Sequence, residues 1–260
     1  MEYIAKKRYG QNFLTDSRVL NFISDNLILN DNDLVIEIGP GKGALTKTLL
    51  NKGARVYCYE IDLDMKPYLN NLDQKRLTIK YENFLDANIL EDTKSYDYEN
   101  IFVVANIPYY ITTPIIKKII ASKIKFKEIY LMVQKEVADR LSALPKTRDY
   151  GSLTVFINTF YTCKKILDVK KTSFDPIPKV DSAIIKLVSK ETNLIDYKEL
   201  EKLLKSSFSH KRKTLKNNLT NNLEEINIIL QKHNLSLNNR AEEIPVEVFI
   251  EISNFLSQKK

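Results

Sequence analysis

The sequence predicts an α/β protein with a seven-stranded, mostly parallel sheet, followed by a small all-helical domain. Up to Val188, apolar runs alternate with stretches of helical periodicity, which is the pattern of a parallel sheet with covering helices. Runs such as Ile101-Phe102-Val103-Val104 are apolar throughout, as is typical of strands buried on both faces. Beyond Tyr197 the apolar residues recur only at helical spacing, which predicts a helical tail.

The expected elements follow from these patterns. We expect strands at Leu34–Ile38, Arg55–Tyr59, Leu77–Lys80, Ile101–Ala105, Ile129–Val133, Leu153–Phe160 and Ala183–Val188. We expect helices at Ser17–Leu27, Ala44–Asn51, Pro114–Ser122 and Lys135–Leu144. The polar stretch Ser189–Asn193 marks a boundary, so we expect one domain at 1–189 and a helical domain at 190–260.

Composition narrows the class of protein. There is no apolar run long enough to span a membrane, and the N-terminus lacks the apolar core of a signal peptide, so we expect a cytoplasmic protein without a membrane partner. The two cysteines and two histidines show no disulfide or metal-ligand spacing, so no metal is expected. The net charge of +7 permits a polyanionic partner but does not by itself predict one.

A glycine-rich loop follows the first expected strand. It reads Glu37-Ile38-Gly39-Pro40-Gly41-Lys42-Gly43 and leads directly into a helix. Glycines let a backbone turn sharply and approach a ligand closely. Glu60 lies 19 residues after Gly41, at the end of the next strand, where a carboxylate can accept the hydroxyls of a ribose. A structural tight turn remains the alternative, because the loop lacks a complete Gly-x-Gly-x-x-Gly pattern.

The tetrapeptide Asn106-Ile107-Pro108-Tyr109 ends the fourth expected strand and faces the same crevice as the glycine loop. The N6 amine of adenine is a weak nucleophile, because its lone pair is delocalised into the ring. The Asn106 side-chain oxygen and a backbone carbonyl just before or at Pro108 can accept the amine hydrogens and free that lone pair. Tyr109 can stack on a base that has been flipped out of its helix. The alternative is a polar strand-to-loop turn with a buried tyrosine.

Taken together, these motifs resemble the bacterial small-subunit (16S) rRNA adenine N6,N6-dimethyltransferases over nearly the whole chain. Besides the two motifs above, the resemblance is carried by Tyr9–Leu14, Tyr59–Asp62, Ile111–Pro114, Gln134–Arg140, Phe174–Ser182 and Phe208–Leu215.

The resemblance implies a Rossmann-like class I methyltransferase domain that uses S-adenosyl-L-methionine, and a helical domain that helps to hold rRNA. It implies transfer of methyl groups to two adjacent adenosines near the 3′ end of 16S rRNA in the small ribosomal subunit, by a monomer, with a role in subunit biogenesis. The catalytic residues that it implies are Asn106, Pro108, Tyr109 and Phe174, the last stacking on the target adenine unless it is a plain hydrophobic anchor. The cofactor-binding residues that it implies are Gln11, Asn12, Leu14, Gly39, Gly41, Glu60, Ile61, Asn83, Phe84 and Asn106.

One departure from the family pattern concerns the cofactor. Asn83 stands where the family usually has an aspartate that receives the cofactor's adenine amine, and Asp86 follows three residues later. An asparagine still offers a carbonyl acceptor. We therefore expect Asn83 to serve, and Asn83→Asp to bind the cofactor equally well or better.

The tail contains a basic stretch. Lys205, Arg212 and Lys216 are spaced seven and four residues apart, which places them on one face of a helix, with Lys211 and Lys213 beside them. Such a density of cations suits phosphate contacts with RNA. A solvated helix face is the alternative.

Three other functions compete with this interpretation. A 23S rRNA methylase of the antibiotic-resistance type shares the cofactor loop and Asn-Ile-Pro-Tyr, but the stretches Gln134–Arg140 and Ser209–Lys213 argue against it. A non-catalytic ribosome-assembly factor is disfavoured by the intact Glu60, Asn106 and Tyr109. A nicotinamide dehydrogenase is disfavoured because the third glycine of its loop is missing.

Overall fold

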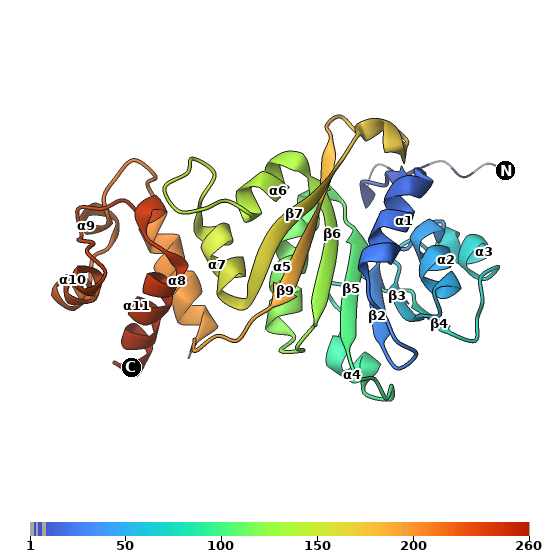
Figure 1. Ribbon diagram of the computed structural model, residues 1–260, viewed down its shortest axis with the longest axis horizontal. Helices are drawn as coiled ribbons and strands as arrows, with labels where there is room; N and C mark the ends of the chain where they lie inside the picture. Colours follow the sequence, from blue (N-terminus) through green and yellow to red (C-terminus); the bar gives the residue numbers. More distant parts are fainter. Residues whose placement is uncertain (1–2, 4, 7–8, 195, 260) are drawn as a thin grey trace. The chain divides into compact units, whose positions relative to one another are not determined.

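A computed structural model describes residues 3, 5–6, 9–194 and 196–259, and the chain forms two compact units (Figure 1). The first unit comprises residues 1–138 and 165–189. The second comprises residues 139–164 and 190–260. Among the described residues, no helix has the length and apolar character needed to cross a membrane.

A seven-stranded sheet organises the first unit, in the order β4-β3-β2-β5-β6-β9-β7. Strands β2 to β6 pair in parallel, and β9 runs antiparallel to β6. The strand bounds are β2 Leu34–Ile38, β3 Arg55–Tyr59, β4 Leu77–Lys80, β5 Ile101–Asn106, β6 Glu128–Gln134, β7 Tyr161–Val169 and β9 Ser182–Ser189. The predicted class, a mostly parallel seven-stranded sheet, is therefore confirmed.

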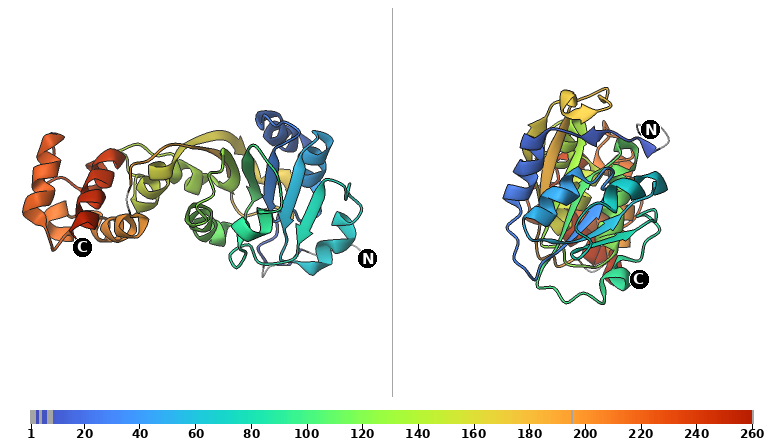
Figure 2. Two further views of the ribbon diagram at one scale, coloured as in Figure 1. Left: turned by 90° about the horizontal axis from the view of Figure 1, so that it is seen from below. Right: turned by 90° about the vertical axis from the view of Figure 1, so that its right-hand side faces the viewer.

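Helices cover both faces of this sheet (Figure 2). Alternate residues of the central strands, such as Val35 and Phe102, belong to one apolar cluster with α1 (Ser17–Asn26) and α2 (Ala44–Asn51). On the opposite face, the Tyr59 hydroxyl donates a hydrogen bond of 3.0 Å to Asp92. Because both faces are buried, the central strands β2, β5 and β6 consist mostly of apolar residues. The remaining helical elements wholly within this unit are η2 Leu63–Met65, α3 Lys66–Leu69, α4 Ile89–Thr93, η3 Tyr109–Ile111, α5 Thr112–Ala121 and η4 Lys171–Ser173.

Residues 9–14 line the same pocket as the residues at the carboxyl ends of β2, β3 and β5. We call the described residues from Tyr3 to Leu14 the N-terminal strap. Within it, β1 (Phe13–Leu14) pairs antiparallel with β8 (Phe174–Asp175), a short sheet of its own. This pairing joins the strap to a segment that lies far away in the sequence.

The second unit is built around helices α7, α8, α10 and α11. Helix α11 packs against the other three, and the buried Leu200, Leu203 and Phe249 form part of its core. The Tyr150 hydroxyl donates to the carbonyl of Ile244 at 2.9 Å and so ties the two segments of the unit together. The bounds are α7 Ser152–Phe160, α8 Tyr197–Ser207, α9 Leu215–Asn218, α10 Leu223–Lys232, η5 Ala241–Glu243 and α11 Val246–Gln258.

One predicted strand is wrong. Residues Leu153–Phe160 form most of helix α7, and the seventh strand is instead β7, directly after it. The Thr154 hydroxyl accepts from the Gly151 N–H at 3.1 Å, which caps the first turn of the helix. Helix α7 packs against α8 and α11, so its apolar run is buried between helices. A short apolar run has no periodicity that separates a buried helix from a strand.

This helix also moves the predicted domain boundary. The sequence places residues 139–164 in the first domain, but they belong to the second unit. Helix α6 (Lys135–Leu141) is shorter than the expected Lys135–Leu144, and α5 begins two residues before the expected Pro114. The other predicted elements agree with the structure to within a residue or two at each end.

Candidate active site

A pocket of about 540 Å³ opens at the carboxyl ends of β2, β3 and β5 in the first unit. The crevice beyond these strand ends is where open α/β sheets bind their ligands. The sequence-predicted cofactor residues all line it: Gln11, Asn12, Leu14, Gly39, Gly41, Glu60, Ile61, Asn83, Phe84 and Asn106. The structure therefore brings together residues from the strap and from four separate strand ends.

The glycine loop forms the floor of the pocket. Gly39 has a φ of +70°, and a Cβ added there would meet no atom within 4 Å. This open space above the backbone is a cradle that a ligand can approach closely. Gly41, with a φ of +56°, is covered instead: an added Cβ would lie 2.9 Å from the ring of Phe13 in the strap.

Glu60 is buried beside this loop and fixed by the main chain. Its Oε2 accepts from the Gly41 N–H at 3.0 Å, and its Oε1 accepts from the Asp62 N–H at 2.8 Å. Burial raises the pKa of Glu60 in spite of these donors. Each carboxylate oxygen keeps a further lone pair, so Glu60 fits the role of accepting ribose hydroxyls. Those hydroxyls would be additional donors to the carboxylate and would counteract its desolvation.

Glu37 is a second buried carboxyl group on the pocket. Burial raises its pKa to about 7. The Cys58 thiol, itself buried, lies 3.7 Å from Glu37 Oε2 and donates to it. Two carboxyl groups on one pocket suit a ligand that carries positive charge.

Asn83 and Phe84 line the side of the pocket. Asn83 Nδ2 donates to Asp86 at 2.9 Å, and its Oδ1 accepts from the Leu85 N–H at 3.2 Å. Asp86 is not among the described residues that line the pocket, so Asn83 is the one of the two that faces a ligand. The Phe84 ring meets Tyr59 edge to face, with the ring centroids 5.3 Å apart.

The end of β5 presents Asn106 to the pocket. Its Nδ2 donates to the main-chain carbonyl of Asn12 at 3.0 Å. The Pro108 carbonyl accepts from the Ile111 N–H at 3.1 Å within the following turn. Gly10 lets the strap approach this turn, since a Cβ on Gly10 would lie 3.2 Å from that of Pro108. The side chain of Tyr109 lies outside the described part of the structure, so its stacking role stays a prediction.

Phe174 is placed differently from expectation. It is 3% exposed, belongs to the apolar cluster of the first unit, and pairs through β8 with Leu14. It is not among the described residues that line the pocket. In this arrangement Phe174 acts as a hydrophobic anchor for the strap, and stacking on a flipped adenine would require β1 and β8 to move.

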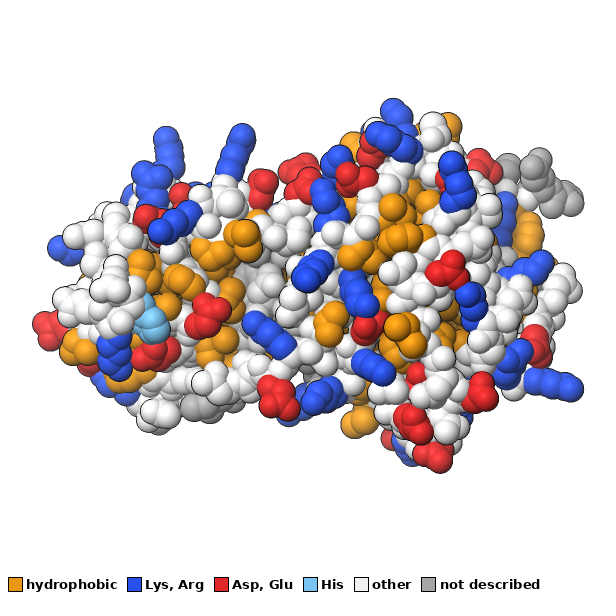
Figure 3. All heavy atoms as spheres, in the orientation of Figure 1, with side chains coloured by type: hydrophobic (Ala, Val, Ile, Leu, Met, Phe, Trp, Pro, Cys, Tyr) orange, Lys and Arg blue, Asp and Glu red, His pale blue; other side chains and the backbone are white. Residues whose placement is uncertain are grey.

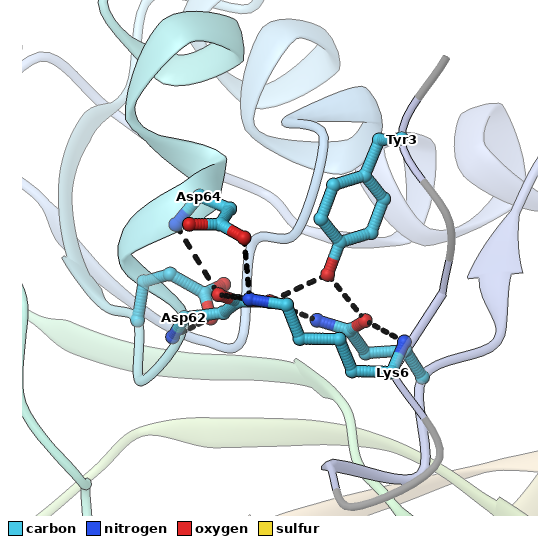
Figure 4. A network of polar contacts seen from close by, with 6 residues as sticks. Tyr3, Lys6, Asp62 and Asp64 are labelled. Carbon is cyan, nitrogen blue, oxygen red and sulfur yellow. Dashed lines mark hydrogen bonds and ion pairs between the residues drawn. The ribbon is translucent and has the colours of Figure 1, made fainter. Parts of the chain in front are cut away.

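A polar network around Asp62 is the part of the site that the sequence does not reveal (Figure 4). Asp62 caps the turn η2 by accepting from the Asp64 N–H at 3.2 Å, as its helix-start position suggests. It also accepts from Tyr3 and Lys6 of the strap, at 2.5 and 2.6 Å. These partners lie more than fifty residues apart, and Tyr3 and Lys6 stand in no motif that would single them out.

The basic residues of the second unit do not share a helix face, which corrects the prediction. Helix α8 ends at Ser207, and the next helix begins at Leu215, so Lys205 and Lys216 lie on different helices. We call the exposed residues 209–213 between them the basic turn; they include Lys211, Arg212 and Lys213. Figure 3 shows Lys and Arg side chains projecting from this unit and from the other, so the positive charge is not confined to one site.

The basic turn is held in place by one asparagine. Asn218 Nδ2 donates to the Ser207 carbonyl at 2.7 Å and to the His210 carbonyl at 3.2 Å. Its Oδ1 accepts from the Ser209 hydroxyl at 3.2 Å. These bonds satisfy carbonyls at the end of α8 and stop the helix before the cations.

Comparisons with known proteins show the family of the chain. Residues 3–258 match the model of the family described as Ribosomal RNA adenine dimethylase. The chain is 41% identical to the Ribosomal RNA small subunit methyltransferase A of Aster yellows witches'-broom phytoplasma (strain AYWB), over 96% of this chain and 95% of that protein. The crystal structure of a dimethyladenosine transferase from Plasmodium falciparum superimposes with a TM-score of 0.78 and 27% identity, covering 95% of this chain and 97% of that one.

The fold is shared more widely. The crystal structure of the 23S rRNA methyltransferase ErmE has a TM-score of 0.70 at 24% identity, covering 95% of this chain and 100% of that one. The class I methyltransferase fold is thus common to both kinds of rRNA methyltransferase, whereas the family match covers nearly the whole sequence. The chain therefore belongs to the ribosomal RNA adenine dimethylase family.

Proposed function

We propose that this protein transfers methyl groups from S-adenosyl-L-methionine to the N6 amines of two adjacent adenosines near the 3′ end of 16S rRNA, giving N6,N6-dimethyladenosine. It acts as a monomer on the small ribosomal subunit, in the cytoplasm, and contributes to subunit biogenesis. The relative from the phytoplasma is named for small-subunit rRNA, which supports this choice of substrate.

The residues of the pocket fit the cofactor. Glu60 would hold the ribose, Asn83 and Phe84 would contact the adenine ring, and the open backbone of Gly39 allows the cofactor to lie close to the loop. When bound, S-adenosyl-L-methionine supplies an electrophilic methyl group on a positively charged sulfur. A bound positive charge would favour the ionised forms of Glu37 and Glu60 and so counteract the effect of burial on their pKa values.

The orientation of Asn106 is the observation that carries the proposal. Because its Nδ2 donates to the Asn12 carbonyl, its Oδ1 is left to accept a hydrogen from the target amine. The Pro108 carbonyl accepts from Ile111 and keeps a second lone pair, so the second acceptor is this carbonyl or that of Ile107. Two acceptors on the amine localise the lone pair of N6 and raise its nucleophilicity. Acceptors held in place before the reaction stabilise the transition state without reorganisation.

Labelled cofactor and purified ribosomal subunits test the proposed function. The protein is incubated with unmethylated small or large subunits, and the modified bases are mapped by mass spectrometry, with Asn106→Ala as the strongly impaired control. We expect label in two adjacent adenosines near the 3′ end of small-subunit rRNA. Label in the large subunit would assign the antibiotic-resistance type of activity, and no label in either would favour a non-catalytic assembly factor.

A further inference from the structure

The carboxylate of Asp62 is the point at which the N-terminal strap is fastened (Figure 4). Its Oδ2 accepts from the Tyr3 hydroxyl at 2.5 Å and from Gln11 Nε2 at 2.9 Å, and its Oδ1 pairs with Lys6 Nζ at 2.6 Å. Burial alone would raise the pKa of Asp62, but donation from Lys6, Tyr3 and Gln11 outweighs it and lowers the pKa to about 2. Asp62 is therefore charged at neutral pH and attracts all three donors.

Gln11 is held through both ends of its carboxamide. While Nε2 donates to Asp62, Oε1 accepts from the Lys6 N–H at 2.8 Å and lies 2.6 Å from the Tyr3 hydroxyl. A side chain with both polar atoms engaged has one favourable orientation. The main chain that follows Gln11 is fixed with it.

Asn12, the residue after Gln11, connects the strap to Asn106. The carbonyl of Asn12 accepts from Asn106 Nδ2 at 3.0 Å, and the side chain of Asn12 donates to the Gly10 carbonyl at 3.2 Å. The contact decides which way the Asn106 carboxamide faces, with its NH₂ group toward the strap. If the amide were flipped, two carbonyl oxygens would face each other without a hydrogen between them, which is unfavourable.

We propose that Asp62 and Tyr3 are positioning residues for the methyl transfer: they hold Gln11 and, through the carbonyl of Asn12, orient the Asn106 carboxamide toward the target amine. This inference rests on the proposed function, because it requires Asn106 Oδ1 to accept a hydrogen from N6. Neither Asp62 nor Tyr3 contacts the adenine in this scheme. Their effect is on orientation at the reacting centre, where a displacement of about 1 Å can cost roughly a hundredfold in rate.

Conservative substitutions test the proposal. Asp62→Asn removes the charge, and Tyr3→Phe removes one hydroxyl. We expect both to lower kcat for methylation of small subunits, Asp62→Asn by roughly tenfold or more. The KM for subunits should stay near its wild-type value, and kcat is compared at saturating S-adenosyl-L-methionine, because Gln11 and Asn12 also line the cofactor pocket. Asp64→Asn is the matched control: Asp64 pairs with the same Lys6 at 2.6 Å, but its side chain is 61% exposed, and its kcat should be unchanged.

A double-mutant cycle separates positioning from a general loss of structure. In an Asn106→Ala background, followed by single-turnover measurements, Asp62→Asn should cause no further loss, because the group that it orients is gone. A purely structural role would lower the rate in both backgrounds and would overturn the proposal. If Asp62→Asn folds poorly, the Tyr3→Phe variant provides the test. A wild-type kcat for Tyr3→Phe would then refute the inference. A wild-type protein that methylates no small-subunit adenosine would instead refute the proposed function.

Discussion

At the residue scale, Asn83 lies between the pocket and a carboxylate, and this determines what a charge at position 83 would do. Asn83 Nδ2 donates to Asp86 at 2.9 Å, so an aspartate at 83 would set two carboxylates against each other. From the sequence alone, Asn83→Asp is expected to bind the cofactor equally well or better. The structure reverses that expectation, because two negative charges at this separation repel each other.

We predict that Asn83→Asp weakens binding of S-adenosyl-L-methionine several-fold. The double variant Asn83→Asp with Asp86→Asn should recover the affinity, because it exchanges donor and acceptor but keeps one hydrogen bond and one charge. Isothermal titration calorimetry on the single and double variants measures both. Tighter binding by Asn83→Asp alone would mean that Asp86 turns away from position 83.

Glu37 makes the stability of the protein depend on pH. In the unfolded chain this carboxyl group ionises near its ordinary pKa of 4.5, whereas burial raises its pKa in the folded protein to about 7. Between these values the unfolded chain loses a proton that the folded protein keeps. The contribution of Glu37 to the free energy of unfolding therefore decreases as pH rises from about 4.5 to 7, by roughly 3 kcal/mol in total.

We predict that Glu37→Gln removes this dependence. Urea unfolding of wild type and variant, without cofactor, should show the difference in unfolding free energy shifting in favour of Glu37→Gln between pH 4.5 and 7, and staying constant above that range. Parallel curves over the whole range would show that Glu37 ionises normally in the folded protein.

Glu60 and Asp62 show which residues of the site can be predicted from the sequence and which cannot. The role of Glu60 follows from its distance to the glycine loop, because β2 and β3 are adjacent parallel strands whose ends must meet. The partners of Asp62 come from the part of the strap that precedes β1, and no periodicity relates Tyr3 to Asp62. Sequence therefore predicts the residues that the sheet places and misses those that irregular backbone brings to them.

At the element scale, the loop between α8 and α9 shows why the basic residues were first assigned to one helix. A spacing of seven and four residues fits a continuous helix, but Asn218 takes the Ser207 and His210 carbonyls and ends α8 early. The cations of the basic turn consequently stand on a loop anchored at both ends. A fixed loop can meet phosphates with less loss of entropy than a mobile one.

We predict that Lys211→Glu with Lys213→Glu weakens binding to small subunits and flattens its salt dependence. Each lost phosphate contact should reduce the log–log salt slope by about one unit. Lys198→Glu with Lys202→Glu is the matched control, because it makes the same charge change on exposed positions of α8. Filter binding at several salt concentrations compares the two. Equal losses for both pairs would point to net charge rather than to the basic turn.

At the scale of the whole molecule, the pocket and the basic turn lie in different units. Every described residue that lines the pocket belongs to the first unit, and the basic turn belongs to the second. The sequence predicts the sheet well because strand order follows from short crossovers and buried apolar runs. It misplaces residues 139–164 because the position of α7 is set by packing against α8 and α11, which follow it in the chain.

The strap that covers Gly41 also contacts Asn106, so cofactor exchange and the orientation of the Asn106 carboxamide depend on the same segment. Dimethylation of one adenosine consumes two cofactor molecules, so spent cofactor must leave between the transfers. An exchange that lifts Phe13 from the glycine loop also withdraws the Asn12 carbonyl from Asn106. The hydrogen bond between Asn12 and Asn106 must then break and form again before the second methyl transfer, while the monomethylated adenosine is still bound. The yield of monomethyladenosine should therefore depend on the rate at which the strap returns to the glycine loop relative to the rate at which the rRNA dissociates.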